Sequence, residues 1–151
     1  MKKILVASDH AGFDLKQKFI KDNPQLPWED LGPFDTQSVD YPDYAKKLCE
    51  KLIAATGSLP VTEDAFKAEV CGVLICGSGQ GMAIKANKYP QIRAALCWNE
   101  DVARLSRQHN NANVLCVGSR AVDAATAQKI LMAYLEASFE GGRHSQRVAK
   151  I

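Results

Sequence analysis

The chain has 151 residues, of which 46% are hydrophobic and 24% are charged, and these values predict one globular domain over residues 1–151. The formal net charge of +2 at pH 7 gives no indication of a nucleic-acid partner. The apolar run at the amino terminus is too short for a signal peptide or a membrane span, so we expect a cytoplasmic protein that makes no contact with a membrane.

The chain begins with a strand-like run followed by a helix-like pattern. Lys3–Ser8 is predicted to form a strand, and in the helix that follows Leu15 and Phe19 share one face. Asp9 and His10 lie between the two, at the carboxyl end of the strand. Asp9 is suited to cap the helix, which is the simpler interpretation. A His beside an acid can also bind an anion or move protons.

A second strand and a second helix are predicted next. Pro27–Leu31 has the character of a short strand, and Gly32–Pro42 is a loop rich in turn residues. The helix that follows ends near Gly57. Its apolar residues recur at every fourth position, at Tyr44, Leu48 and Leu52. The polar connection Ser58–Lys67 is interpreted as a surface insertion.

The central stretch combines a buried strand with a glycine-rich loop. Val70–Cys76 is a continuous apolar run, which is typical of a strand buried on both faces of a parallel sheet. Glycines then occupy every second position, at Gly77, Gly79 and Gly81. A loop of this kind can turn several N–H groups toward one anion. Its spacing fits neither the Walker pattern nor the dinucleotide-binding pattern.

A thiol and a hydroxyl accompany this loop. Cys76 is the last residue of the predicted strand and Ser78 follows two positions later. Ligands of open parallel sheets bind beyond the carboxyl ends of the strands, where a thiol can act as a nucleophile or a base. A free cysteine can equally be a small buried hydrophobic residue. The residues of the loop leave both interpretations open.

Strands and helices continue to alternate after the loop. The predicted elements are a helix over Gly81–Lys88, a strand over Ile92–Cys97, a helix over Asn99–Gln108, a strand over Asn113–Val117 and a helix over Asp123–Phe139. His109 directly follows the predicted helix Asn99–Gln108, where it can simply interact with the helix dipole. The order of elements predicts an α/β fold with a parallel sheet and helices on both faces. Asp9, Cys76 and Arg120 then share one edge of the sheet.

The last segment, residues 141–151, is a basic tail. If it is helical, Arg143 and Arg147 project from one face and suit a phosphate, although a solvated basic tail is the simpler interpretation. The five cysteines form an odd set without a Cys-x-x-Cys pair or a His at ligand spacing. We therefore expect neither disulfides nor a metal site.

Several motifs together resemble the family of type B ribose-5-phosphate isomerases and galactose-6-phosphate and allose-6-phosphate isomerases. The resemblance covers essentially the whole chain and departs from the family pattern only in the long connection Ser58–Lys67. The motifs are Ser8-Asp9-His10, Asp40-Tyr41-Pro42, Cys76-Gly77-Ser78-Gly79-Gln80-Gly81, Ala86-Asn87-Lys88, Ser106-Arg107-Gln108-His109-Asn110, Asn113-Val114, Gly118-Ser119-Arg120 and Glu140-Gly141-Gly142-Arg143-His144.

The resemblance implies a Rossmann-like three-layer α/β/α sandwich with a five-stranded parallel sheet, and aldose–ketose isomerisation without a metal or another cofactor. It implies that Cys76 is the base that moves a proton between carbons 1 and 2, although some relatives place a Glu elsewhere in the loop. Ser78 would relay the proton between the two sugar oxygens, and His109, with Asp9 as helper, would open the ring. The implied substrate-binding residues are His10, Tyr41, Gly77, Gly79, Gly81, Asn110, Asn113, Arg120, Arg143 and Arg147.

The predicted function is therefore the interconversion of ribose 5-phosphate and ribulose 5-phosphate. Isomerisation of a galactose, allose or tetrose phosphate, and a catalytically silent sugar-phosphate-binding subunit, are the alternatives. The resemblance also implies a homodimer or a dimer of dimers. In such an assembly, Cys76 of one subunit would work with His109 of its partner.

Overall fold

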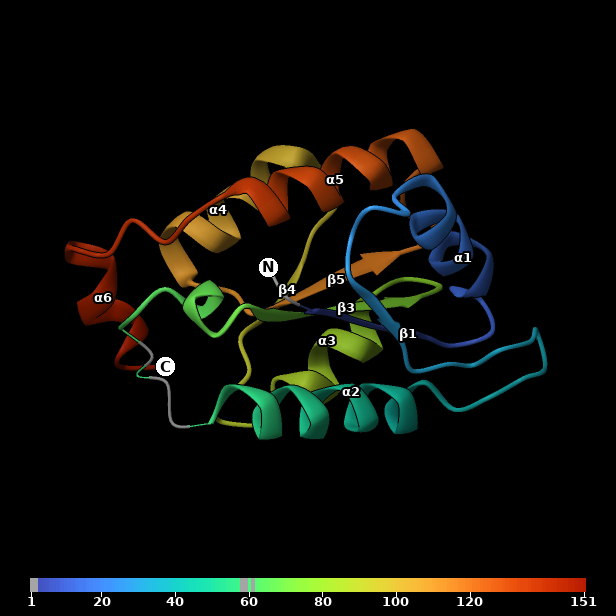
Figure 1. Ribbon diagram of the computed structural model, residues 1–151, viewed down its shortest axis with the longest axis horizontal. Coiled ribbons are helices and arrows are strands. Elements are labelled where there is room, and N and C mark those ends of the chain that lie inside the picture. Colours follow the sequence, from blue (N-terminus) through green and yellow to red (C-terminus); the bar gives the residue numbers. More distant parts are fainter. Residues whose placement is uncertain (1–2, 58–59, 61) are drawn as a thin grey trace.

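The computed structural model describes residues 3–57, 60 and 62–151. Within these residues, five strands form one parallel sheet in the order β2-β1-β3-β5-β4 (Figure 1). The strands are β1 (Lys3–Ser8), β2 (Trp28–Asp30), β3 (Val70–Cys76), β4 (Ala94–Leu96) and β5 (Val114–Gly118). The α-helices are α1 (Phe13–Asp22), α2 (Tyr41–Thr56), α3 (Gln80–Ala86), α4 (Glu100–Asn110), α5 (Ala124–Glu136) and α6 (Arg143–Val148). The predicted α/β/α sandwich is confirmed.

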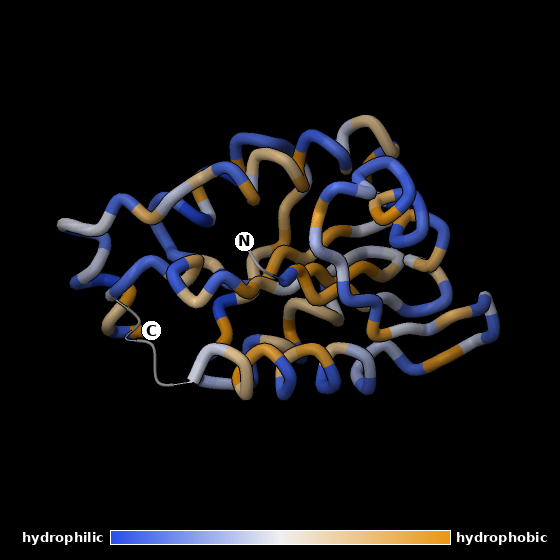
Figure 2. Tube along the Cα trace, in the orientation of Figure 1, coloured by the Kyte–Doolittle hydropathy of each residue, from blue (hydrophilic) through white to orange (hydrophobic). Residues whose placement is uncertain are grey.

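Side chains of the central strands alternate between two hydrophobic layers. In β1, Ile4 and Val6 pack against α1, α4 and α5, whereas Leu5 and Ala7 pack against α2 and α3. The two helix layers lie on opposite faces of the sheet in Figure 1, and the strands between them are the most hydrophobic part of the chain in Figure 2. This double burial explains why β3 is an uninterrupted apolar run.

The strand order creates a crevice at one edge of the sheet. β1 and β3 are neighbours in the sheet. The chain continues from β1 to β2 on one side of this pair, and from β3 to β4 and β5 on the other side. Ligands of open α/β sheets bind at such a switch point, beyond the carboxyl ends of the strands. The residues that follow β1 and β3 therefore face the same space.

Several predicted boundaries differ from the structure, and those of α2 and β4 have a clear physical reason. Helix α2 already begins at Tyr41, so Tyr41 and Pro42 belong to its first turn and not to the preceding loop. Proline is tolerated in a first turn because the N–H groups there have no partner within the helix. Strand β4 is shorter than Ile92–Cys97, because the Ile92 N–H bonds to the Tyr89 carbonyl in a turn, at 2.9 Å, before the ladder begins.

The predicted surface insertion Ser58–Lys67 is exposed at Pro60, Thr62, Glu63 and Lys67, but its residues 64–66 pack against the protein. Residues 58, 59 and 61 lie outside the described part. The short 3₁₀ helix η1 (Ala65–Ala68) packs against the end of α4. The side chain of Arg107 is fully buried, binds Asp64, and places its Cζ 3.6 Å from the centre of the Phe66 ring. The Ala65 N–H donates to Asn111 Oδ1 at 2.8 Å. This segment is therefore an integral part of the packing.

The predicted basic tail folds back as a helix. In α6, Arg143 and Arg147 are exposed, whereas His144 and Val148 are buried. Helix α6 lies beside the end of α4, at the end of the molecule away from the carboxyl edge of the sheet (Figure 1). Across the described part of the chain, every helix falls short of the length or the apolar character needed to span a bilayer.

Candidate active site

A pocket of about 420 Å³ opens at the carboxyl edge of the sheet. It is lined by residues that follow β1, β3 and β5 and by the first residue of α2. The lining residues are Asp9, His10, Ala11, Tyr41, Cys76, Gly77, Ser78, Gly81, Arg120 and Ala121. Eight of these ten had been predicted as site residues from the sequence. The prediction that three loops meet at this edge is confirmed.

The thiol of Cys76 lies at the base of this pocket. Cys76 ends β3 and is only 4% exposed, and its Sγ accepts a hydrogen bond from the Gly79 N–H at 3.1 Å. The Gln80 N–H donates to Ser78 Oγ at 3.3 Å. Backbone donors of the loop therefore point at the thiol and at the hydroxyl. Such a donor stabilises negative charge on sulfur.

At two positions of the loop, neighbouring atoms lie too close to leave room for any side chain, so only glycine fits. Gly79 has a φ of +78°, and a Cβ at this position would lie 2.4 Å from Leu96 Cδ1. A Cβ at Gly81 would lie 2.5 Å from Tyr41 Cζ, so the Tyr41 ring rests directly on this glycine. The glycine spacing thus serves both the turn and the contact with an aromatic side chain at the mouth of the pocket.

Asp9 and His10 are held by backbone hydrogen bonds. Asp9 is buried, and its Oδ1 accepts the Gly12 N–H at 2.9 Å. The N-cap position of α1 is Gly12, and the Asp9 carboxylate caps the turn that leads into this helix, which supports the capping interpretation. His10 accepts the Val39 N–H at Nδ1, at 3.2 Å, which leaves its Nε2 for a ligand.

Arg120 brings a positive charge to the pocket. The Ser119 N–H bonds to the Cys76 carbonyl at 2.8 Å, and the Arg120 N–H bonds to the Gly77 carbonyl at 3.0 Å. These bonds join the loops after β3 and β5. The guanidinium of Arg120 lies over Gly77, where a Cβ would be 3.3 Å from an Nη1 atom. A phosphate in the pocket would find this guanidinium without a rearrangement of the backbone.

Five of the predicted site residues lie at the opposite edge of the sheet. Helix α4 starts at the carboxyl edge and runs back across the sheet, so His109, in its last turn, is at the amino edge. The imidazole of His109 stacks on that of His144, with ring centres 4.2 Å apart. Arg143 and Arg147 are on α6 next to this pair. One chain alone therefore does not bring His109 to Cys76.

The two asparagines near His109 differ from each other. Asn110 is exposed and lines a separate hollow beside β4. Asn113 is buried, accepts the Arg93 N–H at 2.8 Å and donates to the Gln91 carbonyl at 2.8 Å. Because both ends of its amide are used, Asn113 fixes the start of β5. Its assignment to substrate binding is a sequence prediction that the structure does not favour.

The four cysteines other than Cys76 belong to the core. Burial raises the pKa of Cys49, Cys71 and Cys97 to about 12, and it also raises the pKa of Cys116 well above its ordinary value. All five thiols are free. These four side chains are buried and do not line the pocket, whereas Cys76 is the thiol that reaches it.

Glu140 and His144 were not assigned a role from the sequence, although they belong to one of its motifs. Glu140 Oε2 lies 3.8 Å from His109 Nε2 and 3.7 Å from His144 Nε2. Their spacing of four residues was the available signal. We name the residues His109, Glu140, Arg143, His144 and Arg147 the histidine cluster, and the lining of the carboxyl-edge pocket the thiol pocket.

Comparison with known proteins gives consistent results. The sequence matches the Ribose/Galactose Isomerase family over residues 4–151. Ribose-5-phosphate isomerase B of Escherichia coli (strain K12) is 42% identical over 153 residues, which covers 100% of this chain and 95% of that protein. A crystal structure of a ribose 5-phosphate isomerase from Thermotoga maritima has a TM-score of 0.86 at 43% identity, over 98% of this chain and 95% of the other. The crystal structure of ribose-5-phosphate isomerase B from Mycoplasma genitalium with bound ribulose-5-phosphate has a TM-score of 0.85 at 39% identity, over 98% and 92% of the two chains.

Proposed function

Because this chain belongs to the ribose/galactose isomerase family, we propose that it interconverts ribose 5-phosphate and ribulose 5-phosphate, with Cys76 as the base. Members of the family are sugar-phosphate isomerases. Our proposal adds which sugar phosphate is the substrate and which residue is the base. The observation that carries it is the position of Cys76 Sγ, in a pocket at the end of β3 and 3.1 Å from the Gly79 N–H. We propose a cytoplasmic location for the enzyme.

The chemical step transfers one hydrogen between neighbouring carbons. The Cys76 thiolate takes the proton from carbon 2 of the open aldose, which leaves an enediolate, and returns it to carbon 1. The proton of the hydroxyl on carbon 2 moves to the oxygen of carbon 1, and Ser78 is in the loop position to relay it. Donors aimed at a developing oxyanion are usually the largest catalytic contribution in such reactions.

The remaining roles are divided between the thiol pocket and the histidine cluster. In the proposed site, His109 opens the furanose ring, and Asp9 helps it. His10 and Arg120 bind the phosphate from one side, and Arg143 and Arg147 bind it from the other. Tyr41 and Asn110 line the sugar. We assign Asn113 to the support of β5, because both ends of its amide are already bonded.

This division requires two subunits. The thiol pocket lies at the carboxyl edge of the sheet, and the histidine cluster lies at the amino edge. We propose a two-fold symmetric dimer, alone or as half of a dimer of dimers, in which the histidine cluster of each subunit completes the thiol pocket of its partner. Such an isologous arrangement gives two shared sites per dimer.

Steady-state kinetics on a panel of phosphorylated pentoses, hexoses and tetroses tests the proposal. Ribose 5-phosphate should give the highest kcat/KM. A higher value for a galactose, allose or tetrose phosphate would assign the enzyme to that substrate. Tight binding of every sugar phosphate without turnover would identify a silent binding subunit and contradict the proposal.

A pair of cysteine variants tests the base. Cys76→Ala should lower kcat by about 10²–10⁴-fold, the usual contribution of a general base, while ribose 5-phosphate binding changes little. Cys49→Ala is the matched control, because Cys49 is buried in the same hydrophobic layer and does not line the pocket. Near-normal turnover by Cys76→Ala would exclude Cys76 as the base.

A further inference from the structure

Three side chains of the histidine cluster have the chemistry of metal ligands. His109, Glu140 and His144 each offer one ligand atom, and these atoms all lie within 4.8 Å of one another. Two imidazoles and one carboxylate form a common donor set for zinc. We propose that these three residues bind a divalent transition-metal ion such as Zn²⁺, and that the bound ion inhibits the isomerase by occupying His109.

The distances are close to those of a coordinated ion. Glu140 Oε2 is 3.8 Å from His109 Nε2 and 3.7 Å from His144 Nε2. Ligand bonds of about 2.0–2.1 Å in tetrahedral geometry separate two ligand atoms by about 3.3 Å. The two distances from Glu140 must therefore contract by about half an ångström, and the stacked rings, now 5° from parallel, must tilt until each ring plane contains the ion.

The backbone that carries the three ligands is already fixed. The Glu140 N–H donates to the Gln108 carbonyl at 3.0 Å, which ties Glu140 to the turn of α4 that carries His109. The His144 N–H donates to the Gly141 carbonyl at 3.0 Å, in the turn that joins Glu140 to α6. Because these bonds hold the segments together, ion binding orders only side chains, which lowers its entropic cost.

Charge and burial favour a borderline transition metal over a hard cation. His144 is buried, and its ring stacks on that of His109, so the two imidazoles and the carboxylate lie together at one place. Arg143 and Arg147 on α6 oppose a cation, and Glu140 is the one carboxylate in the cluster. Nitrogen ligands with a single carboxylate suit Zn²⁺ or Cu²⁺, whereas Mg²⁺ and Ca²⁺ prefer several oxygens.

Inhibition rests on the proposed role of His109 in ring opening, whereas metal binding does not. An imidazole that holds an ion through Nε2 has no lone pair there to accept or deliver a proton. Glu140 and His144 are given no chemical step of the proposed reaction, but both contact His109. The effect of Zn²⁺ on each variant is therefore compared with the activity of that same variant without Zn²⁺.

The first measurement is isothermal titration of the metal-free full-length protein with Zn²⁺ alone. We expect one ion per chain, and an affinity at least about tenfold weaker in both His144→Ala and Glu140→Gln. Glu140 is half exposed, so Glu140→Gln preserves folding if His144→Ala does not. His10→Gln and Cys76→Ala are matched controls from the thiol pocket and should bind Zn²⁺ as the unsubstituted protein does. Equal affinity in Glu140→Gln and the unsubstituted protein, or loss of binding in Cys76→Ala, would overturn the site.

The second measurement is activity during the same Zn²⁺ titration. The unsubstituted enzyme should lose activity at the concentrations that fill the site, and Glu140→Gln should need at least about tenfold more Zn²⁺ for the same loss. Full activity of the filled enzyme would overturn the inhibition and remove His109 from the proposed reaction. If the protein turned over no sugar phosphate, the titration by heat would still decide whether the ion binds.

Discussion

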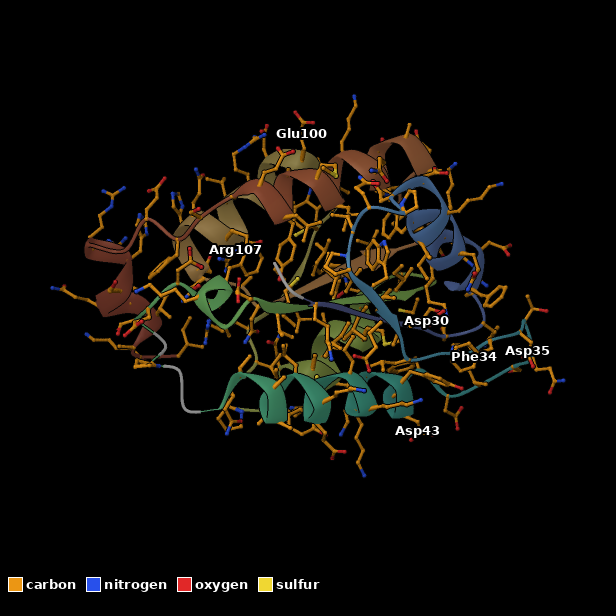
Figure 3. All side chains as sticks on the ribbon, in the orientation of Figure 1. Asp30, Phe34, Asp35, Asp43, Glu100 and Arg107 are labelled. Atoms are coloured by element: carbon orange, nitrogen blue, oxygen red, sulfur yellow. The ribbon has the colours of Figure 1, made fainter. Side chains whose placement is uncertain are left out.

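The pair formed by Asp64 and Arg107 gives a prediction about stability that depends only on the fold. Arg107 is fully buried, and Figure 3 shows its side chain on the side of α4 that faces η1. Its guanidinium also donates to the Ala112 carbonyl, at 2.7 Å, and to Asn111 Oδ1, at 3.1 Å. Asp64 supplies the opposite charge and also accepts the Phe139 N–H at 3.0 Å.

Replacing Asp64 with Ala should therefore destabilise the protein strongly. Removing one partner of a buried ion pair costs about 3–5 kcal/mol, because the other charge stays buried without compensation. Asp64 is 23% exposed, and water that reaches the site places the expected loss near the lower end, about 3 kcal/mol. The melting temperature should fall by about 6–12 °C in a chain of this length.

Urea unfolding of both proteins at one protein concentration measures this loss. Glu63→Ala is the matched control, because Glu63 is the neighbouring acid. Its side-chain carboxylate forms an ion pair with Lys67 at the surface, at 3.1 Å. That exposed pair should contribute less than about 1 kcal/mol. If Asp64→Ala were no less stable than Glu63→Ala, the account of the buried pair would be wrong.

The stability difference should also depend on pH. Desolvation alone would raise the pKa of Asp64, but hydrogen bonds from the Phe66 and Phe139 N–H groups, together with Arg107, outweigh it and lower that pKa. A carboxylate with a lowered pKa stabilises the fold above its unfolded pKa of about 3.9, and the contribution is lost as the pH falls through the folded value. The difference between the unsubstituted protein and Asp64→Ala should be constant from neutral pH to about pH 5 and shrink below about pH 4.

Three further predictions concern the site. Activity should survive prolonged dialysis against a chelator, and a loss that a divalent ion restores would contradict a metal-free reaction. Arg143→Ala and Arg147→Ala should each raise the KM for ribose 5-phosphate by about 10–150-fold. This range corresponds to the loss of about 1.5–3 kcal/mol from a charge-assisted hydrogen bond to the phosphate. Unchanged kinetics in both variants would exclude the two arginines from the site. Gly79→Ala should lower kcat by about 10²–10³-fold, because its Cβ would lie 2.4 Å from Leu96 Cδ1 and would displace the N–H group that donates to the thiol. Gly57→Ala is the control, because Gly57 also has a positive φ but a Cβ there would have no atom within 4 Å. This control should leave kcat unchanged.

The sequence predicted well whatever depends on local pattern. The bounds of β3 follow from a continuous apolar run between Glu69 and Gly77, and the glycines mark where the chain must turn. Parallel strands predict that Asp9, Cys76 and Arg120 share one edge of the sheet, and the adjacency of β1, β3 and β5 brings them into one pocket.

Contacts between distant segments could not be predicted in the same way. The polar residues around Asp64 in the sequence do not indicate that this acid pairs with a buried arginine 43 residues later. The stack of His109 on His144 depends equally on how α6 folds back against α4. Local periodicity describes single elements, and these two contacts depend on the relative placement of elements.

The central claim is that Cys76 of one subunit and His109 of its partner form one site, and mixed dimers test it most directly. Cys76→Ala and His109→Ala chains should each be nearly inactive alone. After unfolding and refolding in equal amounts, about half of the dimers are mixed, and each mixed dimer regains one intact site of its two, so activity should return to about a quarter of that of the unsubstituted enzyme. If a tag-based pull-down shows mixed dimers while activity stays at the level of the single variants, the shared site is refuted.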